Sequence, residues 1–211
     1  MPYSLAADDI ARHLNEAGLE MVLLNAPAGD WEKGERGFAA LPGREAAIRE
    51  SLDRGLAYAR AARCSRLHVL AGVVPEDTNP AEAEKTYIAN LRLAAEQAAA
   101  AGVRVLIEPL NAHDAPGYFL NRMDQAAAIL DAVGHPNLYL QYDVYHARMT
   151  GEPLAETFLA HRGRIAHVQI AGVPGRHEPI PSDISYADLF QLIDESGYEG
   201  WIGCEYRPRS G

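Results

Sequence analysis

Several features are scarce or missing in this 211-residue sequence, and each absence excludes a class of protein. Cysteine occurs only twice, at Cys64 and Cys204, so a disulfide framework is not expected, and two free thiols fit a reducing, cytoplasmic compartment. No stretch approaches the roughly 18 apolar residues that indicate a membrane span. The start, MPYSLAADDI, lacks the cationic and apolar regions of a signal peptide.

Positive charge is also scarce. The sequence has 19 Lys and Arg against 29 Asp and Glu, a net charge of −10, which excludes the basic surface that nucleic-acid binding requires. A GxGxxG turn after a strand, a P-loop, an HExxH helix and a GxSxG elbow are absent too. We therefore expect a small-molecule partner, with no nucleic acid and no membrane.

What the sequence does contain is a repeated alternation of amphipathic helix and short apolar strand. Six such units follow one another, and glycines at 18, 102, 134 and 197 separate four of the helices from their strands. Alternation of this kind predicts an α/β fold with a parallel sheet. With 48% hydrophobic residues and no linker, residues 1–211 are expected to form a single domain.

The number of units leaves the architecture open. A (β/α)₈ barrel needs eight strands and typically about 250 residues, whereas six units are present. The periodicity is therefore compatible with an open α/β sheet or with a TIM-barrel-like fold that lacks two units.

Four of the strands end on an oxygen-bearing side chain. The stretches are VLIEP, LYLQYD, AHVQIAG and WIGCEY, and the side chains are Glu108, Asp143, Gln169 and Glu205. Active sites of parallel α/β proteins are built at the carboxyl ends of the strands. Two Glu, one Asp and one Gln meeting there would form a cage suited to a hard divalent cation.

Each of these side chains also has a simpler interpretation. Asp143 could serve only as the N-cap of the next helix, and Glu205 could pair with Arg207 or Arg209. His146, three residues after Asp143, could reach back to the site if the chain turns helical there. Arg176 could hold a substrate carboxylate or lie at the surface. For His68, inside another strand, we favour a structural role.

Five long stretches together resemble the hydroxypyruvate isomerase family, within the xylose-isomerase-like TIM barrels. They run over nearly the whole chain and read LNAPAGDWEKGERGFAALPGRE, IEPLNAHDAPGYFLN, VGHPNLYLQYDVYH, RIAHVQIAGVPGRHEP and GYEGWIGCEYRP.

The resemblance implies a site and a reaction. It implies Mg²⁺ or Mn²⁺ held by Glu108, Asp143, Gln169 and Glu205, with Glu108 and Glu205 as the proton donor and acceptor. It also implies that hydroxypyruvate is converted to tartronate semialdehyde through a metal-stabilised enediolate. Substrate-binding candidates are His146, Arg176, His68 and Glu178.

One departure from the family pattern bears on the assembly. Members of the family usually begin with a further β-α-β segment, which this sequence does not show before residue 1. Unpaired strand edges would then be exposed, so we expect either a homo-oligomer that covers them or marginal stability. Part of the pocket wall would also be missing.

Other functions remain in competition. A 2-oxo-tetronate isomerase or a ketose 3-epimerase is the nearest alternative, and a non-catalytic barrel that assembles with a partner is another. The negative charge and the lack of a His-rich zinc constellation argue against an endonuclease on the same barrel.

Overall fold

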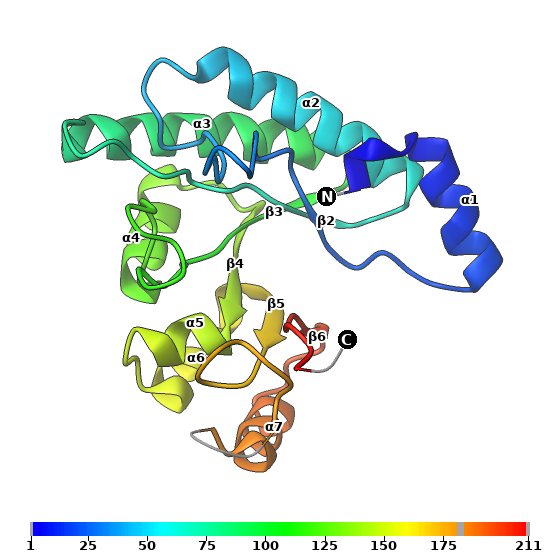
Figure 1. The fold of residues 1–211 in the computed structure, drawn as a ribbon, viewed down its shortest axis with the longest axis vertical. Coiled ribbons are helices and arrows are strands. Elements are labelled where there is room, and N and C mark those ends of the chain that lie inside the picture. The colour runs from blue at the N-terminus through cyan, green and yellow to red at the C-terminus, as the bar shows by residue number, and fades with distance from the viewer. Residues whose placement is uncertain (1, 181–183, 210–211) are drawn as a thin grey trace. The chain divides into compact units, whose positions relative to one another are not determined.

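The computed structural model describes residues 2–180 and 184–209, and within these ranges it contains six strands that alternate with helices (Figure 1). Every pairing described between strands is parallel, which confirms the predicted α/β class and its six helix–strand units. The chain divides into two compact units, described separately below. Our description of residues 1–211 as one domain stays a prediction.

The first unit comprises Met1–Ile107 together with the short segments Gly117–Phe119 and Ala128–Tyr139. Its elements are η1 (Pro2–Ser4), α1 (Ala7–Ala17), β1 (Leu24–Asn25), α2 (Glu45–Ala61), β2 (Arg66–His68), α3 (Pro80–Ala100) and β3 (Arg104–Ile107). The strands pair in the order β1-β2-β3. Helices α2 and α3 lie side by side and pack against β2 and β3, so both strands have buried apolar side chains (Figure 1).

The ends of these helices follow from local sequence. Helix α1 ends at Gly18, which takes the left-handed conformation with φ of 63°, as the glycine pattern predicted. Helix α3 begins after Asn79, whose side chain accepts a hydrogen bond from the Ala81 N–H, and Pro80 occupies the first helical turn, where its missing donor is harmless.

The second unit comprises Glu108–Pro116, Leu120–Ala127 and Leu140–Gly211. Two elements, α4 (Met123–Val133) and β4 (Leu138–Asp143), belong partly to each unit. The remaining elements are α5 (Val144–Met149), α6 (Leu154–His161), η2 (Arg162–Arg164), β5 (Ile165–Ile170), α7 (Tyr186–Glu195) and β6 (Ile202–Cys204). The strands pair in the order β4-β5-β6, and Asp143 lies opposite Gln169, which lies opposite Gly203. This register places the polar ends of three strands at one edge.

The strands are short, and β5 is buried along its whole length. Such burial explains why their sequences are nearly continuous apolar runs, since both faces of a parallel sheet are covered. Among the described residues, no helix combines the length and apolar character that crossing a membrane requires.

Candidate metal and catalytic site

Glu108 is a buried carboxylate directly after the last residue of β3. Pro109 follows it and has no N–H to donate, so the chain leaves the strand at this point. Glu108 is only 5% exposed, and Gln141 gives its carboxylate a hydrogen bond. Burial, followed by the charges of Asp143 and Glu205, raises the pKa of Glu108 well above its usual value. This side chain therefore has the environment of a group that exchanges a proton.

Asp143 ends β4 and is also the N-cap of α5. Its Oδ1 accepts hydrogen bonds from the backbone N–H groups of Tyr145, at 2.8 Å, and His146, at 3.3 Å. Its Oδ2 points elsewhere and accepts a hydrogen bond from Arg176, at 2.9 Å. Burial raises the pKa of Asp143, although Arg176 and the two N–H groups oppose that shift. The capping interpretation and the functional one thus use different oxygens of the same carboxylate.

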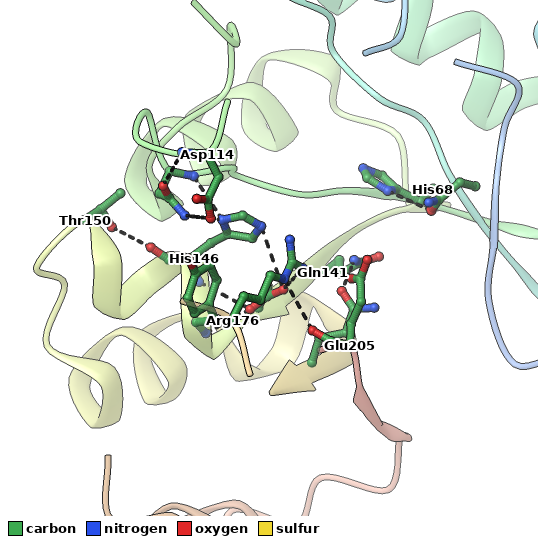
Figure 2. Close-up of polar contacts among 12 residues, drawn as sticks. His68, Asp114, Gln141, His146, Thr150, Arg176 and Glu205 are labelled. Atoms are coloured by element: carbon green, nitrogen blue, oxygen red, sulfur yellow. Dashed lines mark hydrogen bonds and ion pairs between the residues drawn. The ribbon is translucent and has the colours of Figure 1, made fainter. Parts of the chain in front are cut away.

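His146 lies over the same carboxylate because the chain turns helical after Asp143. Its Nε2 is 3.9 Å from Asp143 Oδ2, and its Nδ1 accepts a hydrogen bond from the Asn111 backbone N–H at 3.1 Å (Figure 2). Burial, with a contribution from the positive charge of Arg176, lowers the pKa of His146 to about 3. The imidazole is therefore neutral at physiological pH.

Two glutamines connect the neighbouring strands of the site. Gln141 of β4 donates a hydrogen bond from its Nε2 to Oε1 of Gln169 of β5. Both side chains are buried, and Gln141 also bonds Glu108. Gln169 is thereby joined to Glu108 through one intermediate side chain, which places two predicted metal ligands in a single polar network.

Arg176 joins two other predicted ligands. One nitrogen, Nη2, donates to Asp143 Oδ2 at 2.9 Å and to Glu205 Oε2 at 3.0 Å (Figure 2). Its backbone has a φ of 55°, an uncommon left-handed value for a residue with a side chain. Burial disfavours its charge, yet Asp143 and Glu205 raise the pKa of Arg176 above its usual value. Arg176 is therefore the partner that Glu205 uses, in place of the Arg207 or Arg209 considered from the sequence.

The donor atoms fit a divalent cation. Oxygen or nitrogen atoms of Glu108, Asp143 and His146 lie within 4.8 Å of one another, so this buried group could hold a metal ion. Around it, carboxylates outnumber the single guanidinium, and their mutual repulsion contributes to the raised pKa of Glu108. A bound cation would relieve that repulsion.

Two substrate-binding candidates remain, His68 and Glu178. His68, in β2 of the first unit, is buried with its Nδ1 3.1 Å from Asn25 Oδ1. Glu178, in the second unit, accepts a hydrogen bond from the Arg209 backbone N–H through Oε1 at 3.1 Å. Substrate binding by either residue stays a prediction.

Sequence reasoning missed two residues that contact the site. Asn111 hydrogen-bonds both Asp114 and His146, and hydrogen bonds from Tyr145 and Asn111 lower the pKa of Asp114 to about 2 despite its partial burial. The signal was present as an Asn and an Asp three residues apart just after a strand end, a spacing at which such side chains bond nearby backbone groups.

Comparison with known proteins gives a consistent result. The sequence matches the family described as "Xylose isomerase-like TIM barrel" over residues 1–211. It is 50% identical over 210 residues to a 2-oxo-tetronate isomerase of Cupriavidus necator, covering 100% of this chain and 81% of that protein. It is 40% identical over 210 residues to the hydroxypyruvate isomerase of Escherichia coli, covering 99% of this chain and 81% of that protein.

A solved structure agrees with these relatives. The crystal structure of a Brucella melitensis protein described as an AP endonuclease of family 2 superposes with a TM-score of 0.96 at 43% identity, covering 100% of this chain and 81% of that one. The predicted TIM-barrel-like fold is thus confirmed, and with it the resemblance drawn from the sequence. The chain belongs to the xylose isomerase-like TIM barrel family.

Proposed function

We propose that this chain is a metal-dependent isomerase of small 2-keto-hydroxy acids that converts hydroxypyruvate to tartronate semialdehyde. The observation that supports it most is the gathering of three carboxylates, Glu108, Asp143 and Glu205, around a single guanidinium and beside a neutral imidazole. Relatives at 40–50% identity are named as isomerases of such acids.

Glu108 and Glu205 would be the acid/base pair. The reaction moves one proton from the hydroxyl-bearing carbon to the former carbonyl carbon, and one from the hydroxyl oxygen to the former carbonyl oxygen. One glutamate takes the carbon-bound proton, giving an enediolate, and a glutamate returns a proton to the adjacent carbon. Glu108 is buried and its pKa is raised above its usual value, whereas the Glu205 side chain is 55% exposed and paired with Arg176.

The metal would be Mg²⁺ or Mn²⁺, held by Glu108, Asp143, Gln169 and Glu205. These are oxygen ligands, which both ions prefer. When bound, the ion supplies Lewis-acid stabilisation of the negative charge that develops on the substrate oxygens.

Arg176 and His146 would bind the substrate. Within the described residues, Arg176 donates hydrogen bonds from Nε and Nη2 and none from Nη1. Nη1 is therefore left to donate to a substrate carboxylate. His146 lies beside Asp143 and could contact a substrate oxygen.

The test combines metal content with turnover. Purified protein should contain or take up Mg²⁺ or Mn²⁺, should lose hydroxypyruvate isomerisation on chelation, and should regain it when the ion returns. A Glu199→Gln variant, with an exposed carboxylate outside the site, serves as the matched control. Full activity after complete chelation would refute the metal-dependent mechanism.

A 2-oxo-tetronate isomerase is the second candidate, because the 50% identical relative carries that name. Steady-state kinetics with hydroxypyruvate, 2-oxo-tetronates and ketoses on one preparation would separate the two. The substrate with the highest kcat/KM identifies the activity, and no turnover of any of them would favour a non-catalytic protein. Homo-oligomer formation stays a prediction, to be checked by native mass on the same sample.

A further inference from the structure

Two backbone N–H groups determine the direction of every hydrogen bond around the ring of His146. The Asp114 N–H donates to Asn111 Oδ1 at 2.9 Å, which identifies that atom as the amide oxygen. The amide nitrogen of Asn111 therefore faces Asp114 Oδ2, at 3.1 Å, and His146 Nδ1, at 2.7 Å. A backbone N–H cannot accept a hydrogen bond, so the polarity of the network is not arbitrary.

The backbone N–H of Asn111 adds a second constraint on the same ring atom. It lies 3.1 Å from His146 Nδ1 and can only donate. Nδ1 must then be an unprotonated acceptor, and a neutral imidazole that accepts at Nδ1 carries its proton on Nε2.

The Nε2 atom of His146 has a different environment. It is buried and has no hydrogen-bond partner among the described residues, and Asp143 Oδ2 lies 3.9 Å from it. A buried N–H without a partner is costly, and functional sites are one place where such a group persists.

We propose that Asn111 is a positioning residue that holds His146 as the uncharged Nε2–H tautomer, so that His146 donates a hydrogen bond to a substrate oxygen and is not a metal ligand. The substrate part rests on the proposed function. The tautomer and the exclusion from the metal site rest on the hydrogen bonds alone.

The tautomer distinguishes two possible sets of metal ligands. A metal can bind an imidazole nitrogen only through a free lone pair, and here the lone pair is on Nδ1, where Asn111 occupies it. The compact group Glu108, Asp143 and His146 would then supply two ligands, and further ligands must come from oxygen side chains. An N–H donor is also what stabilises an oxygen that gains negative charge during isomerisation.

Nitrogen NMR of histidine-labelled, substrate-free protein tests the tautomer directly. The two ring nitrogens give separate signals that distinguish Nδ1–H, Nε2–H and imidazolium forms, and a His146→Gln variant assigns the pair by subtraction. A His13→Gln variant, at an exposed position on α1, is the matched control. We expect Nε2–H at neutral pH, unchanged by Mg²⁺; a protonated Nδ1 or a Mg²⁺-dependent change of tautomer would overturn the proposal.

Mn²⁺ affinity, measured by calorimetry, tests the exclusion from the metal site. Replacing an outer partner of a metal ligand typically costs ~10–100-fold in affinity. We expect His146→Gln to lose no more than the ~100-fold of an outer partner, whereas Asp143→Asn should lose far more. A loss in His146→Gln as large as that in Asp143→Asn would assign His146 to the metal.

Substitution of Asn111 tests the positioning role. In Asn111→Asp a carboxylate would replace the amide donor at Nδ1 and compete with the backbone N–H for that atom, so the His146 signals should shift and kcat should fall more than KM changes. In Asn111→Ala the backbone N–H remains, so the Nε2–H signals should persist. His146 signals identical to wild type in Asn111→Asp would overturn the proposal. The spectra do not require turnover. A protein that shows the Nε2–H signals but has no isomerase activity would therefore refute the proposed function and leave the tautomer proposal intact.

Discussion

Glu108 and Glu205 are both glutamates at strand ends, yet their surroundings differ sharply. Glu108 is 5% exposed, its pKa is raised well above normal, and it belongs to a buried side of the site with Gln141, Asp143 and His146. The Glu205 side chain is 55% exposed, forms the exposed side of the site and pairs with Arg176, whose own side chain is 18% exposed. Desolvation favours the neutral carboxyl at Glu108, whereas the Glu205 carboxylate is in contact with solvent and with the Arg176 guanidinium.

Two glutamates of one site can therefore take different roles. Carboxyl groups in different environments, one desolvated and one solvated, are a recurring arrangement in acid/base catalysis. Arg176 links the two sides, because its Nη2 contacts Asp143 on the buried side and Glu205 on the exposed side. Substitutions that make the two sides alike would test whether this difference matters for the reaction.

The largest effect is expected from Glu108→Gln, which keeps the shape of the side chain and removes its negative charge and its proton transfer. Hydroxypyruvate isomerisation should fall by about 10²–10⁴-fold in kcat. We expect a fall in kcat of the same size for Glu205→Gln. Steady-state kinetics on both variants would measure the two effects. Turnover at the parental rate in either variant would remove that glutamate from the acid/base pair.

A smaller effect is expected from Arg176→Gln. The variant removes the guanidinium that would hold the substrate carboxylate, and one hydrogen bond to a charged group contributes about 1.5–3 kcal/mol, or roughly 10–100-fold. We expect kcat/KM to fall by roughly 10–100-fold, mostly through KM if Arg176 holds the substrate carboxylate. A fall confined to kcat would argue against that contact.

The pH dependence of the unfolding free energy should report the raised pKa of Glu108. The folded-state pKa of Glu108 lies above its unfolded value of about 4.3, so its stabilising contribution is complete below that pH and is lost as pH rises through the folded pKa. Chelated protein should therefore unfold more easily at neutral than at mildly acidic pH, by at most about 1.4 kcal/mol per pH unit from this group.

Denaturant unfolding from pH 4.5 upward would measure that slope. Glu108→Gln should flatten it, and Glu199→Gln, which alters an exposed carboxylate, should not. An identical slope in Glu108→Gln would mean that another group is responsible.

The smallest effect is expected from Glu178→Gln. Its carboxylate is well solvated, and its one described hydrogen bond goes to the Arg209 backbone. Surface substitutions usually change stability by less than about 0.5 kcal/mol, and we expect the unfolding free energy to follow that rule. A marked rise in KM with unchanged stability would instead support the predicted substrate contact.

Much of the fold could be predicted because its signals are local. Apolar periodicity located the six strands, and glycine at position 18 marked the end of α1, where the structure shows a left-handed residue. The strand-end pattern also located Glu108, Asp143, Gln169 and Glu205, since the carboxyl ends of parallel strands share an edge.

The contacts among those side chains could not be predicted in the same way. Arg176 binds Asp143, 33 residues earlier, and Glu205, 29 residues later, and nothing in the loop sequence specifies that pairing. The sequence offered Arg207 or Arg209 as partners for Glu205 because they are near in the chain. The link from Gln141 to Gln169 depends likewise on the register of β4 and β5.

The sequence by itself therefore determined which strands end in oxygen-bearing side chains and where the helices stop, because these depend on the alternation of apolar residues and on backbone preferences within a few positions. Only the tertiary structure decided that Glu108 is buried and Glu205 exposed, and that His146 accepts from Asn111. Burial and hydrogen-bond direction depend on neighbours brought from distant parts of the chain, and these two quantities set the charge and the tautomer of the site.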